Sequence, residues 1–383
     1  MKRTREQLEA KENQLLASVG MRSDQSKGRK FPDKEPLYRT SFQRDRDRIL
    51  HTTAFRRLEQ KTQVFITSKG DYFRTRLTHT LEVAQIGRTI ARALGANEDL
   101  IEAICLVHDL GHAAFGHSGE RTLNELLMDS GGFDHNKQSL RIVTKLEQRY
   151  PNFDGLNLTW EVREGIVKHE TEYDESDASE YDPNIRGDLE AQIANVADEL
   201  AYTTHDLDDG LRSGMLNTEK LEGVKMWDML VENVGWHGPQ LEDLDRHRLI
   251  RRLVGILVTD VVEATADRIQ VSGAMSSLGI QELDHNVIGY SDPIMKMNKE
   301  IKTFLFDKFY SHPEVLQMAD NAENTLTSIF NAYKKDPKQM PGGFQEKIES
   351  RGLERTIADY IAGMTDRYAL KENQRISEKG ANS

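Results

Sequence analysis

The amino-acid sequence predicts an all-α protein. Over most of its 383 residues, apolar side chains recur with the three- and four-residue spacing of one helix face. Alternating patterns typical of strands are scarce. Prolines number only 9, so long helices can run without interruption. No apolar run reaches the roughly 18 residues that a membrane-spanning helix needs, so none is expected.

The individual helices follow from this spacing in chain order. A helix is expected after His79, ending at Gly95, where a glycine suits a helix terminus. A second and very apolar helix runs from Leu100 to His108, and a third begins at Leu189. Further helices are expected around residues 245–267, 291–311, 316–333 and 352–370.

The remaining segments suggest how the chain is organised. Residues 1–35 are polar and are expected to be irregular. Residues 36–370 contain no repeat and no boundary that would divide them into independent domains. Within them, residues 171–187 are acidic and rich in turn-forming residues, which indicates a surface loop or insertion. Residues 371–383 are expected to be a frayed tail.

Composition excludes several classes of protein. The 51 basic and 63 acidic residues give a net charge of −12, which is unfavourable for general nucleic-acid binding. A single cysteine, Cys105, allows no intrachain disulfide and no cysteine-rich zinc site, and we expect it to be a small buried side chain. The charged amino terminus does not resemble a signal peptide, so a cytoplasmic location is expected. Phosphate-binding P-loop and serine-nucleophile motifs do not occur.

Two histidines and two aspartates, at three points of the chain, suggest a metal site. They are His79, the adjacent pair His108 and Asp109, and one aspartate within residues 198–206. Imidazole nitrogens and carboxylate oxygens suit a first-row divalent cation, and four such ligands leave positions for water or substrate. Neighbouring ligands fit a helix end better than a helix interior, and Gly111 supports a helix end there.

A histidine–aspartate pair alone is weak evidence, because most such pairs are surface residues or satisfied core pairs. Here the pair ends an apolar helix, LIEAICLVHDLGH, where an unpaired charge would be costly. His112, His117 and Glu120 follow within a few residues. This concentration favours metal binding over the structural alternative.

Long motifs identify a family resemblance that covers about residues 20–370. The chain resembles the HD-domain phosphohydrolases, with their H…HD…D ligand pattern, and within them the bacterial deoxyguanosinetriphosphate triphosphohydrolase-like proteins. The matching stretches are PLYRTSFQRDRDRILHTTAFRRLEQKTQVF (36–65), YFRTRLTHTLEVAQIGRTIARAL (72–94), HDLGHAAFGHSGERTLNELL (108–127), GGFDHNKQSLRIV (131–143), GLNLTWEVREGIVKHE (155–170), LEAQIANVADELAYTTHDLDDGL (189–211) and IADYIAGMTDRYAL (357–370).

The resemblance implies a helical HD core at about residues 72–211, additional amino- and carboxy-terminal helices, and a carboxy-terminal helical part at 212–370. It also implies one divalent metal ion per subunit, held by His79, His108, Asp109 and Asp198. Ligand type does not distinguish Mn, Mg, Fe, Co or Ni.

The stretch ADELAYTTHD also implies a sugar site. Asp198, Tyr202 and Asp206 are spaced four residues apart and therefore share one helix face. By resemblance, Tyr202 packs against the deoxyribose and Asp206 bonds its 3′-hydroxyl group. The alternative for Asp206 is an ordinary charge near a helix end.

His117 and Glu120 share a face if a helix begins near Ser118, and a carboxylate can orient a histidine for proton transfer. By resemblance, His117 and then Glu120 act in the attack on the α-phosphorus, and His112 faces the phosphates. The alternative for His112 is a residue that caps a helix end.

Basic and polar side chains are expected to meet the triphosphate. Arg76 lies one helical turn before His79, and by resemblance it contacts phosphate. Each of these side chains, taken alone, is more often part of a solvated face. The weaker candidates are the basic residues Arg56, Arg57 and Lys61, the base- or sugar-side Gln63, the polar pair Asn136 and Gln138, and Lys168 and His169, whose roles we do not assign.

The resemblance implies hydrolysis of deoxynucleoside triphosphates (dNTPs) to deoxynucleoside and tripolyphosphate, which would control the dNTP pool. The alternatives are a dNTP-sensing regulator with little turnover and another HD nucleotide phosphohydrolase. Relatives form homo-oligomers, often hexamers, and several require a second dNTP as activator. Some relatives bind single-stranded nucleic acid, which the net charge of −12 argues against here. No membrane partner is expected.

Overall fold

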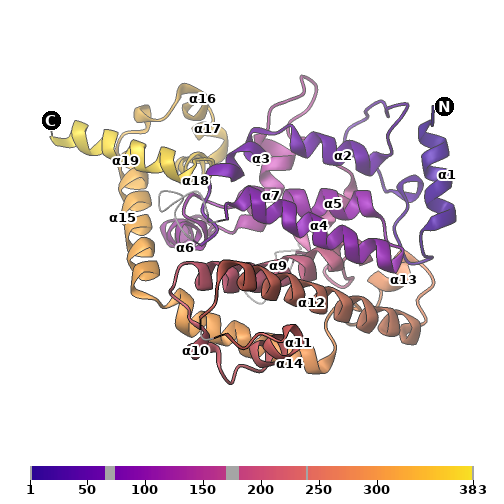
Figure 1. The fold of residues 1–383 in the computed structure, drawn as a ribbon. Coiled ribbons are helices and arrows are strands. Elements are labelled where there is room, and N and C mark those ends of the chain that lie inside the picture. Colours follow the sequence, from indigo (N-terminus) through magenta and orange to yellow (C-terminus); the bar gives the residue numbers. More distant parts are fainter. Residues whose placement is uncertain (1, 65–73, 170–180, 239, 382–383) are drawn as a thin grey trace. The chain divides into compact units, whose positions relative to one another are not determined.

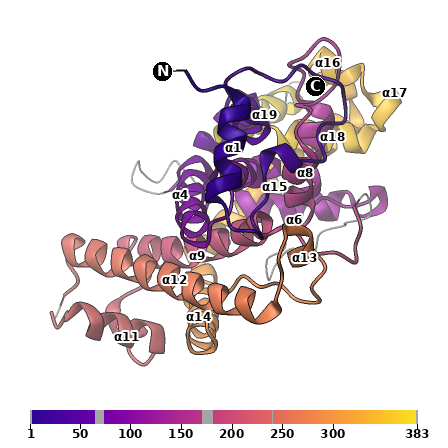
Figure 2. The same cartoon turned by 90° about the vertical axis from the view of Figure 1, so that its right-hand side faces the viewer.

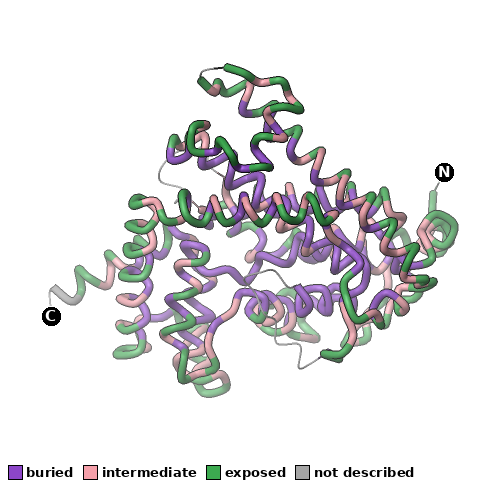
Figure 3. Tube along the Cα trace, turned by 90° about the horizontal axis from the view of Figure 1, so that it is seen from below, coloured by how far each residue is buried: buried purple, intermediate pink, exposed green. Residues whose placement is uncertain are grey.

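The computed structural model describes residues 2–64, 74–169, 181–238 and 240–381. These residues form helices, turns and isolated β-bridges but no β-strand, so the predicted all-α class is confirmed (Figure 1). Among them, no helix combines the length and apolar character that crossing a membrane requires. Buried and exposed turns alternate along most helices, as expected for amphipathic segments (Figure 3).

Contacts along the chain group into two compact units. The first unit contains residues 1–49, 79–106 and 157–312. The second unit contains residues 50–78, 107–156 and 313–383. The boundaries predicted at residues 35 and 370 stay a prediction.

In the first unit, several helices pack against one long helix, α9. The unit's main helices are α1 (Arg5–Leu15), α2 (Ser41–Leu50), α4 (Arg76–Leu94), α5 (Glu98–Val107), α8 (Trp160–Val167), α9 (Leu189–Arg212), α11 (Lys225–Val234), α12 (Asp243–Ser272) and α14 (Asp292–Leu305). Shorter elements are α10 (Thr218–Leu221), α13 (Ser277–Gln281) and a π-helical turn (Phe306–Tyr310) that continues α14.

Helix α9 begins at a capped end. The side chain of Asp188 accepts a hydrogen bond from the backbone amide of Ala191 at 2.7 Å, which satisfies one of the free amides of the first turn. Helices α8, α12, α13 and α14 pack against α9, and α11 packs against α12 and α14 (Figure 2). Most of α9 is buried as a result, including several of its polar residues.

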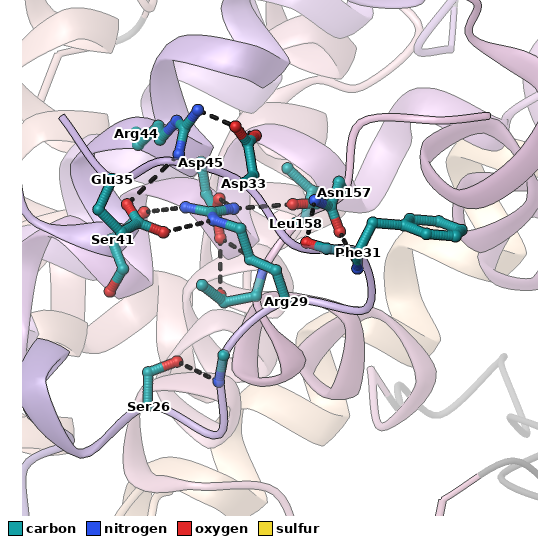
Figure 4. Close-up of polar contacts among 12 residues, drawn as sticks. Ser26, Arg29, Phe31, Asp33, Glu35, Ser41, Arg44, Asp45, Asn157 and Leu158 are labelled. Atoms are coloured by element: carbon teal, nitrogen blue, oxygen red, sulfur yellow. Dashed lines mark hydrogen bonds and ion pairs between the residues drawn. The ribbon is translucent and has the colours of Figure 1, made fainter. Parts of the chain in front are cut away.

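The amino-terminal segment is fixed to the first unit by a buried arginine. Arg29 forms an ion pair with Asp45 of α2 and another with Glu35 at 3.0 Å (Figure 4). Its guanidinium group also donates to the backbone oxygens of Ser41 at 3.0 Å and Asn157 at 2.8 Å. The segment is irregular here, yet its path is determined by these contacts.

Helix α1 departs from the irregular chain expected for residues 1–35. Thr4 and Gln7 form a reciprocal capping box at its start, in which the backbone amide of Thr4 donates to Gln7 Oε1 at 3.1 Å. None of its residues is buried. A helix without an apolar face gives no periodic signal, which is why the hydrophobic pattern did not predict it.

The second unit is built around helix α15. Its elements are α3 (Thr53–Arg57), a 3₁₀ turn (Leu58–Gln60), a 3₁₀ turn (His108–Gly111), α6 (Gly116–Leu126), a 3₁₀ turn (Met128–Ser130), α7 (His135–Arg141), a π-helical turn (Ile142–Leu146), α15 (Pro313–Lys335), a 3₁₀ turn (Pro337–Gln339), α16 (Gly342–Gln345), α17 (Ile348–Arg351), α18 (Leu353–Ala362) and α19 (Asp366–Ala381). Helices α6, α18 and α19 pack against α15, with Leu123, Phe330 and Ile357 in the shared core.

Two predicted segments differ in detail from the structure. The helix expected at 352–370 consists of α18 and α19, separated by a short turn that begins at Gly363. Helix α19 continues to Ala381, through most of the segment expected to be frayed. Residues 171–180 of the predicted acidic loop lie outside the described residues.

Candidate functional site

The predicted metal ligands are divided equally between the two units. His79 and Asp198 belong to the first unit, and His108 and Asp109 belong to the second. Arg76 and the residues predicted to act in catalysis also belong to the second unit.

In the first unit, Asp198 lies between two buried histidines. Nε2 of His79, on α4, is 2.8 Å from Asp198 Oδ1. Nε2 of His169 is 3.5 Å from the other carboxylate oxygen, Oδ2. His79 and His169 are each 1% exposed. The structure thus brings together two predicted ligands and gives His169, to which the sequence assigned no role, a place beside them.

The other ring nitrogen of His79 faces a third histidine. Nδ1 of His79 lies 3.4 Å from Nδ1 of His205, on α9. Nε2 of His205 lies 3.1 Å from Oε2 of Glu82, one turn along α4. Neither His205 nor Glu82 could be predicted from the sequence, because their proximity to His79 depends on how α4 and α9 pack.

The predicted sugar-side residues contact a tyrosine that the sequence analysis missed. Tyr310, in the π-helical turn after α14, donates a hydrogen bond from its hydroxyl group to Asp206 Oδ2. Its ring stacks with that of Tyr202 at a centroid distance of 6.1 Å and an interplanar angle of 23°. The sequence offers no signal for Tyr310, which lies more than 100 residues away in a segment without polar periodicity.

In the second unit, Asp109 is buried among positive and polar groups. Nη1 of Arg76 donates to Asp109 Oδ1 at 3.0 Å, and Nε2 of His112 is 3.1 Å from the same oxygen. Burial favours the neutral acid, but the charges of Arg76, His108 and His112 outweigh it and hold the pKa of Asp109 well below its usual value. Asp109 Oδ2 is buried without a hydrogen-bond partner among the described residues.

Arg76 has buried N–H groups that the described residues do not use as hydrogen-bond donors. It is 1% exposed, and its Nε and Nη2 atoms have no hydrogen-bond partner within the described part of the chain. Gly116 allows the close approach of this guanidinium group, because a Cβ atom there would lie 3.3 Å from Nη2 of Arg76. Gly116 also has a φ of +57°, which favours glycine. A buried guanidinium with unused donors is suited to an anion.

Glu120 gathers three histidines. His135 lies closest, with Nδ1 2.9 Å from Glu120 Oε1, and its backbone amide donates to the same oxygen at 2.7 Å. Nδ1 of His112 is 3.6 Å and Nδ1 of His117 is 3.7 Å from Glu120 Oε2. The predicted His117–Glu120 pair is therefore present, and the side chain of His117 is 48% exposed. His135, which the sequence analysis missed, stacks on His112 at 3.8 Å.

The electrostatics of this cluster favour a neutral His112 beside an ionised Glu120. Burial, together with the charges of Arg76 and His135, lowers the pKa of His112 well below its usual value. Burial opposes ionisation of Glu120, but the histidines around it hold the pKa of this carboxyl group well below its usual value. Glu120 can therefore accept hydrogen bonds and orient the imidazoles.

Lys61 is committed largely to backbone oxygens. Its ammonium group donates to the carbonyl of His112 at 2.5 Å and to that of Ala362 at 2.9 Å. Burial, with the charges of Arg76 and Arg57, lowers the pKa of Lys61 to about 7. These contacts support the turn after Gly111 and leave at most one proton for a ligand.

The other predicted binding residues have mixed environments. Gln63 and Asn136 are buried, whereas Arg56 and Arg57 are exposed. Gln138 donates to Asp359 at 3.1 Å.

Lys168 anchors the segment that returns to α9. Its ammonium group donates to the carbonyl oxygens of Asp182 at 3.1 Å, Ile185, and Arg186 at 3.4 Å. These contacts account for its donors without a ligand, so the structure gives this side chain a positioning task next to His169.

A cavity of about 510 Å³ lies within the second unit. Its wall combines basic and aromatic side chains, including Arg57, Lys347, Arg351, Tyr360 and Tyr368. Arg351 is 3.7 Å from Asp359, and the two tyrosine hydroxyl groups are 3.0 Å apart.

The donor atoms present suit a metal ion. In the first unit, the 2.8 Å between His79 Nε2 and Asp198 Oδ1 matches the separation of about 3 Å expected for neighbouring ligands that are each about 2.1 Å from one ion. In the second unit, His112, His117 and Glu120 lie close enough to share an ion, as do Glu120, Asp134 and His135.

Comparison with known proteins agrees with this chemistry. The HD domain model matches residues 76–203, and the phosphohydrolase-associated domain model matches residues 288–375. A deoxyguanosinetriphosphate triphosphohydrolase-like protein of Geobacter metallireducens is 46% identical over 373 residues, covering 96% of this chain and 97% of the relative.

Two further relatives carry the same description. The Nitrosomonas europaea protein is 44% identical over 366 residues, covering 94% of this chain and 97% of its own length. The Mesorhizobium japonicum protein is 44% identical over 375 residues, covering 92% and 93%. The HD domain is a metal-dependent hydrolase fold, and this family supports nucleotide phosphohydrolase activity. The chain belongs to the family of deoxyguanosinetriphosphate triphosphohydrolase-like proteins.

Proposed function

We propose that the protein hydrolyses deoxynucleoside triphosphates to deoxynucleoside and tripolyphosphate. The observation that carries the proposal is Arg76, whose buried Nε and Nη2 atoms have no hydrogen-bond partner among the described residues. A triphosphate supplies anionic oxygens for such donors. Arg76 also donates to Asp109 Oδ1, and Nε2 of His112 lies 3.1 Å from the same oxygen.

We also propose that His79, His108, Asp109 and Asp198 hold one divalent metal ion per subunit. The order of these residues along the chain and the family support this assignment. In the first unit, the short distance between His79 Nε2 and Asp198 Oδ1 supports it. In the second unit, the support is Asp109 Oδ2, which has no hydrogen-bond partner among the residues that the structure describes. Such an ion supplies Lewis-acid activation of a phosphoryl oxygen and of water.

In this proposal, protein side chains bind the phosphates and transfer the proton. Arg76 binds phosphate oxygens and balances their charge. His117 positions the nucleophile or protonates the leaving 5′-oxygen, with Glu120 and His135 holding the imidazoles in place. His117 suits this role because it is the exposed member of the histidine cluster.

Tyr202 and Asp206 form the sugar-side wall of the proposed site. Tyr310 extends this wall, because it stacks with Tyr202 and bonds Asp206. A 2′-hydroxyl group would have to share the space beside Tyr202, which would discriminate against ribonucleotides. Gln63, Arg57, Lys61 and Asn136 remain secondary candidates for substrate contact.

A product assay tests the proposal. Metal-free protein is supplied with Mn²⁺ or Mg²⁺ and each dNTP, singly and as a mixture, beside a His117→Ala variant. Tripolyphosphate and deoxynucleoside, lost in the variant, are the expected outcome. Orthophosphate or pyrophosphate would indicate another HD phosphohydrolase. Tight dNTP binding without product would indicate the dNTP-sensing regulator.

As part of this proposal, the protein forms a homo-oligomer, such as a hexamer, and a second dNTP activates hydrolysis. The cavity of the second unit supports the activator, because arginines and tyrosines suit phosphates and a base. Activity with the dNTP mixture but not with single dNTPs, lost in Arg351→Glu, would identify this cavity as the activator site. Control of the dNTP pool would place the protein in the cytoplasm.

A further inference from the structure

The two ring nitrogens of His79 face different partners, and all of these partners lie in the first unit. Nε2 faces Asp198 at 2.8 Å, and Nδ1 faces His205 at 3.4 Å. Helix α4 contributes His79 and Glu82, which are three residues apart. Helix α9 contributes Asp198 and His205, which are seven residues apart and share one face. The two helices are therefore joined by polar contacts at two levels.

The proposed binding of a metal ion by Nε2 of His79 determines where the protons of His79 and His205 lie. A histidine that ligates a metal through Nε2 carries its proton on Nδ1. The Nδ1 proton of His79 then points toward His205 Nδ1, which must accept it. His205 accordingly carries its own proton on Nε2, where Glu82 Oε2 lies 3.1 Å away as an acceptor.

The ring geometry fits this hydrogen bond rather than a stacked pair. The planes of His79 and His205 meet at 85°, with the centroids 5.5 Å apart, so ring edges face each other. His205 is 5% exposed, which limits competition from water. The opposite tautomer of His79 would place a proton between Nε2 and Asp198, at the nitrogen that a metal ion needs.

We propose that His205 is a positioning residue that fixes the tautomer and orientation of His79, with Glu82 fixing His205 in turn. The inference rests on the proposed role of His79 as a metal ligand and extends it to two residues outside the H…HD…D pattern. Partners behind a metal-bound histidine commonly change metal affinity about 10- to 100-fold when removed. His205 would therefore affect metal binding without touching the ion.

The test measures binding of Mn²⁺ alone to the full-length protein by competition with a metal-sensitive chelator, without substrate. His205→Ala should weaken Mn²⁺ binding about 10- to 100-fold. His205→Asn should recover much of the loss, because its carbonyl oxygen can accept a proton near the position of the former Nδ1. Glu82→Gln, which keeps an acceptor oxygen, should have a smaller effect.

Two controls separate the outcomes. His285→Ala removes an exposed histidine that pairs with Asp284, and it should leave Mn²⁺ binding unchanged. Thermal unfolding of each metal-free variant detects loss of the fold, and the His205→Asn comparison remains informative if His205→Ala is unstable.

The failure of this inference differs from failure of the proposed function. If His79→Ala abolishes Mn²⁺ binding but His205→Ala and His205→Asn bind like the wild type, the positioning role is overturned and the metal site stands. If His79→Ala itself binds Mn²⁺ normally, the metal role of His79 is wrong, and the inference falls with it.

Discussion

Replacing Arg76 with lysine separates two contacts that one guanidinium group can make at once. In the structure, Nη1 bonds Asp109 at 3.0 Å, while the buried Nε and Nη2 atoms have no hydrogen-bond partner in the described part of the chain. A lysine ammonium group keeps the positive charge beside Asp109. It does not offer the planar set of donors that can hold a carboxylate and a phosphate together.

The magnitude follows from the contacts that are lost. A hydrogen bond to a charged group contributes about 1.5–3 kcal/mol, so loss of one phosphate contact predicts a roughly 10- to 150-fold lower kcat/KM for Arg76→Lys. Arg76→Ala should also lower the free energy of unfolding by about 3–5 kcal/mol, because it leaves Asp109 as an unpaired buried charge. Arg76→Lys should retain most of that stability.

The assay combines initial rates of deoxynucleoside release with urea unfolding of the same preparations. Arg92→Lys serves as the matched control, since Arg92 is exposed and pairs with Glu98. Arg76→Lys with a kcat/KM within about threefold of the wild type would refute the reasoning. Equal destabilisation by lysine and alanine would contradict the proposed compensation of Asp109.

The remaining predictions concern stability, specificity and backbone geometry. Burial raises the pKa of Glu190 from 4.5 to about 7, so ionisation of this carboxyl group opposes folding as pH rises through that interval. Glu190→Gln should therefore be more stable than the wild type at pH 8 and similarly stable at pH 4. A difference in urea unfolding between the two proteins that stays the same at both pH values would contradict this. Tyr202→Ala should admit ribonucleoside triphosphates in the product assay, and an unchanged preference for deoxyribose would count against the proposed wall. Gly116→Ala, at φ +57°, should lower the free energy of unfolding in urea by about 1–2 kcal/mol. Gly255→Ala, whose Cβ would meet nothing within 4 Å, should raise it by about 0.5–1 kcal/mol. Similar effects at both glycines would show that the left-handed backbone of Gly116 is not the cause.

Local periodicity was sufficient for most of the helical fold. Helices α4, α5 and α9 were predicted because each has an apolar face and an identifiable end. Helix α1 was not, since it buries no residue and is held by a capping box and polar contacts. The division of residues 352–370 into α18 and α19 depends on a turn at Gly363 that the apolar pattern does not mark.

The residues of the candidate site also differ in whether local spacing in the sequence could predict them. His117 and Glu120 could be paired from sequence, because three residues on a helix bring side chains to one face. His135, His205 and Tyr310 could not, because each reaches its partner through packing between two different elements, 15 to 126 residues apart in the chain. Lys61 was expected to meet phosphate, and its bonds to two carbonyl oxygens are likewise invisible in a sequence pattern.

The carbonyl contacts of Lys168 have a consequence for the pair formed by His169 and Asp198. The ammonium group binds the backbone oxygens of Asp182 and Arg186, which lie 14 and 18 residues further along the chain. It therefore ties the residue next to His169 directly to the chain that leads into α9, the helix that carries Asp198. One side chain thus anchors the backbone on both sides of this contact, so its removal would loosen both partners at once.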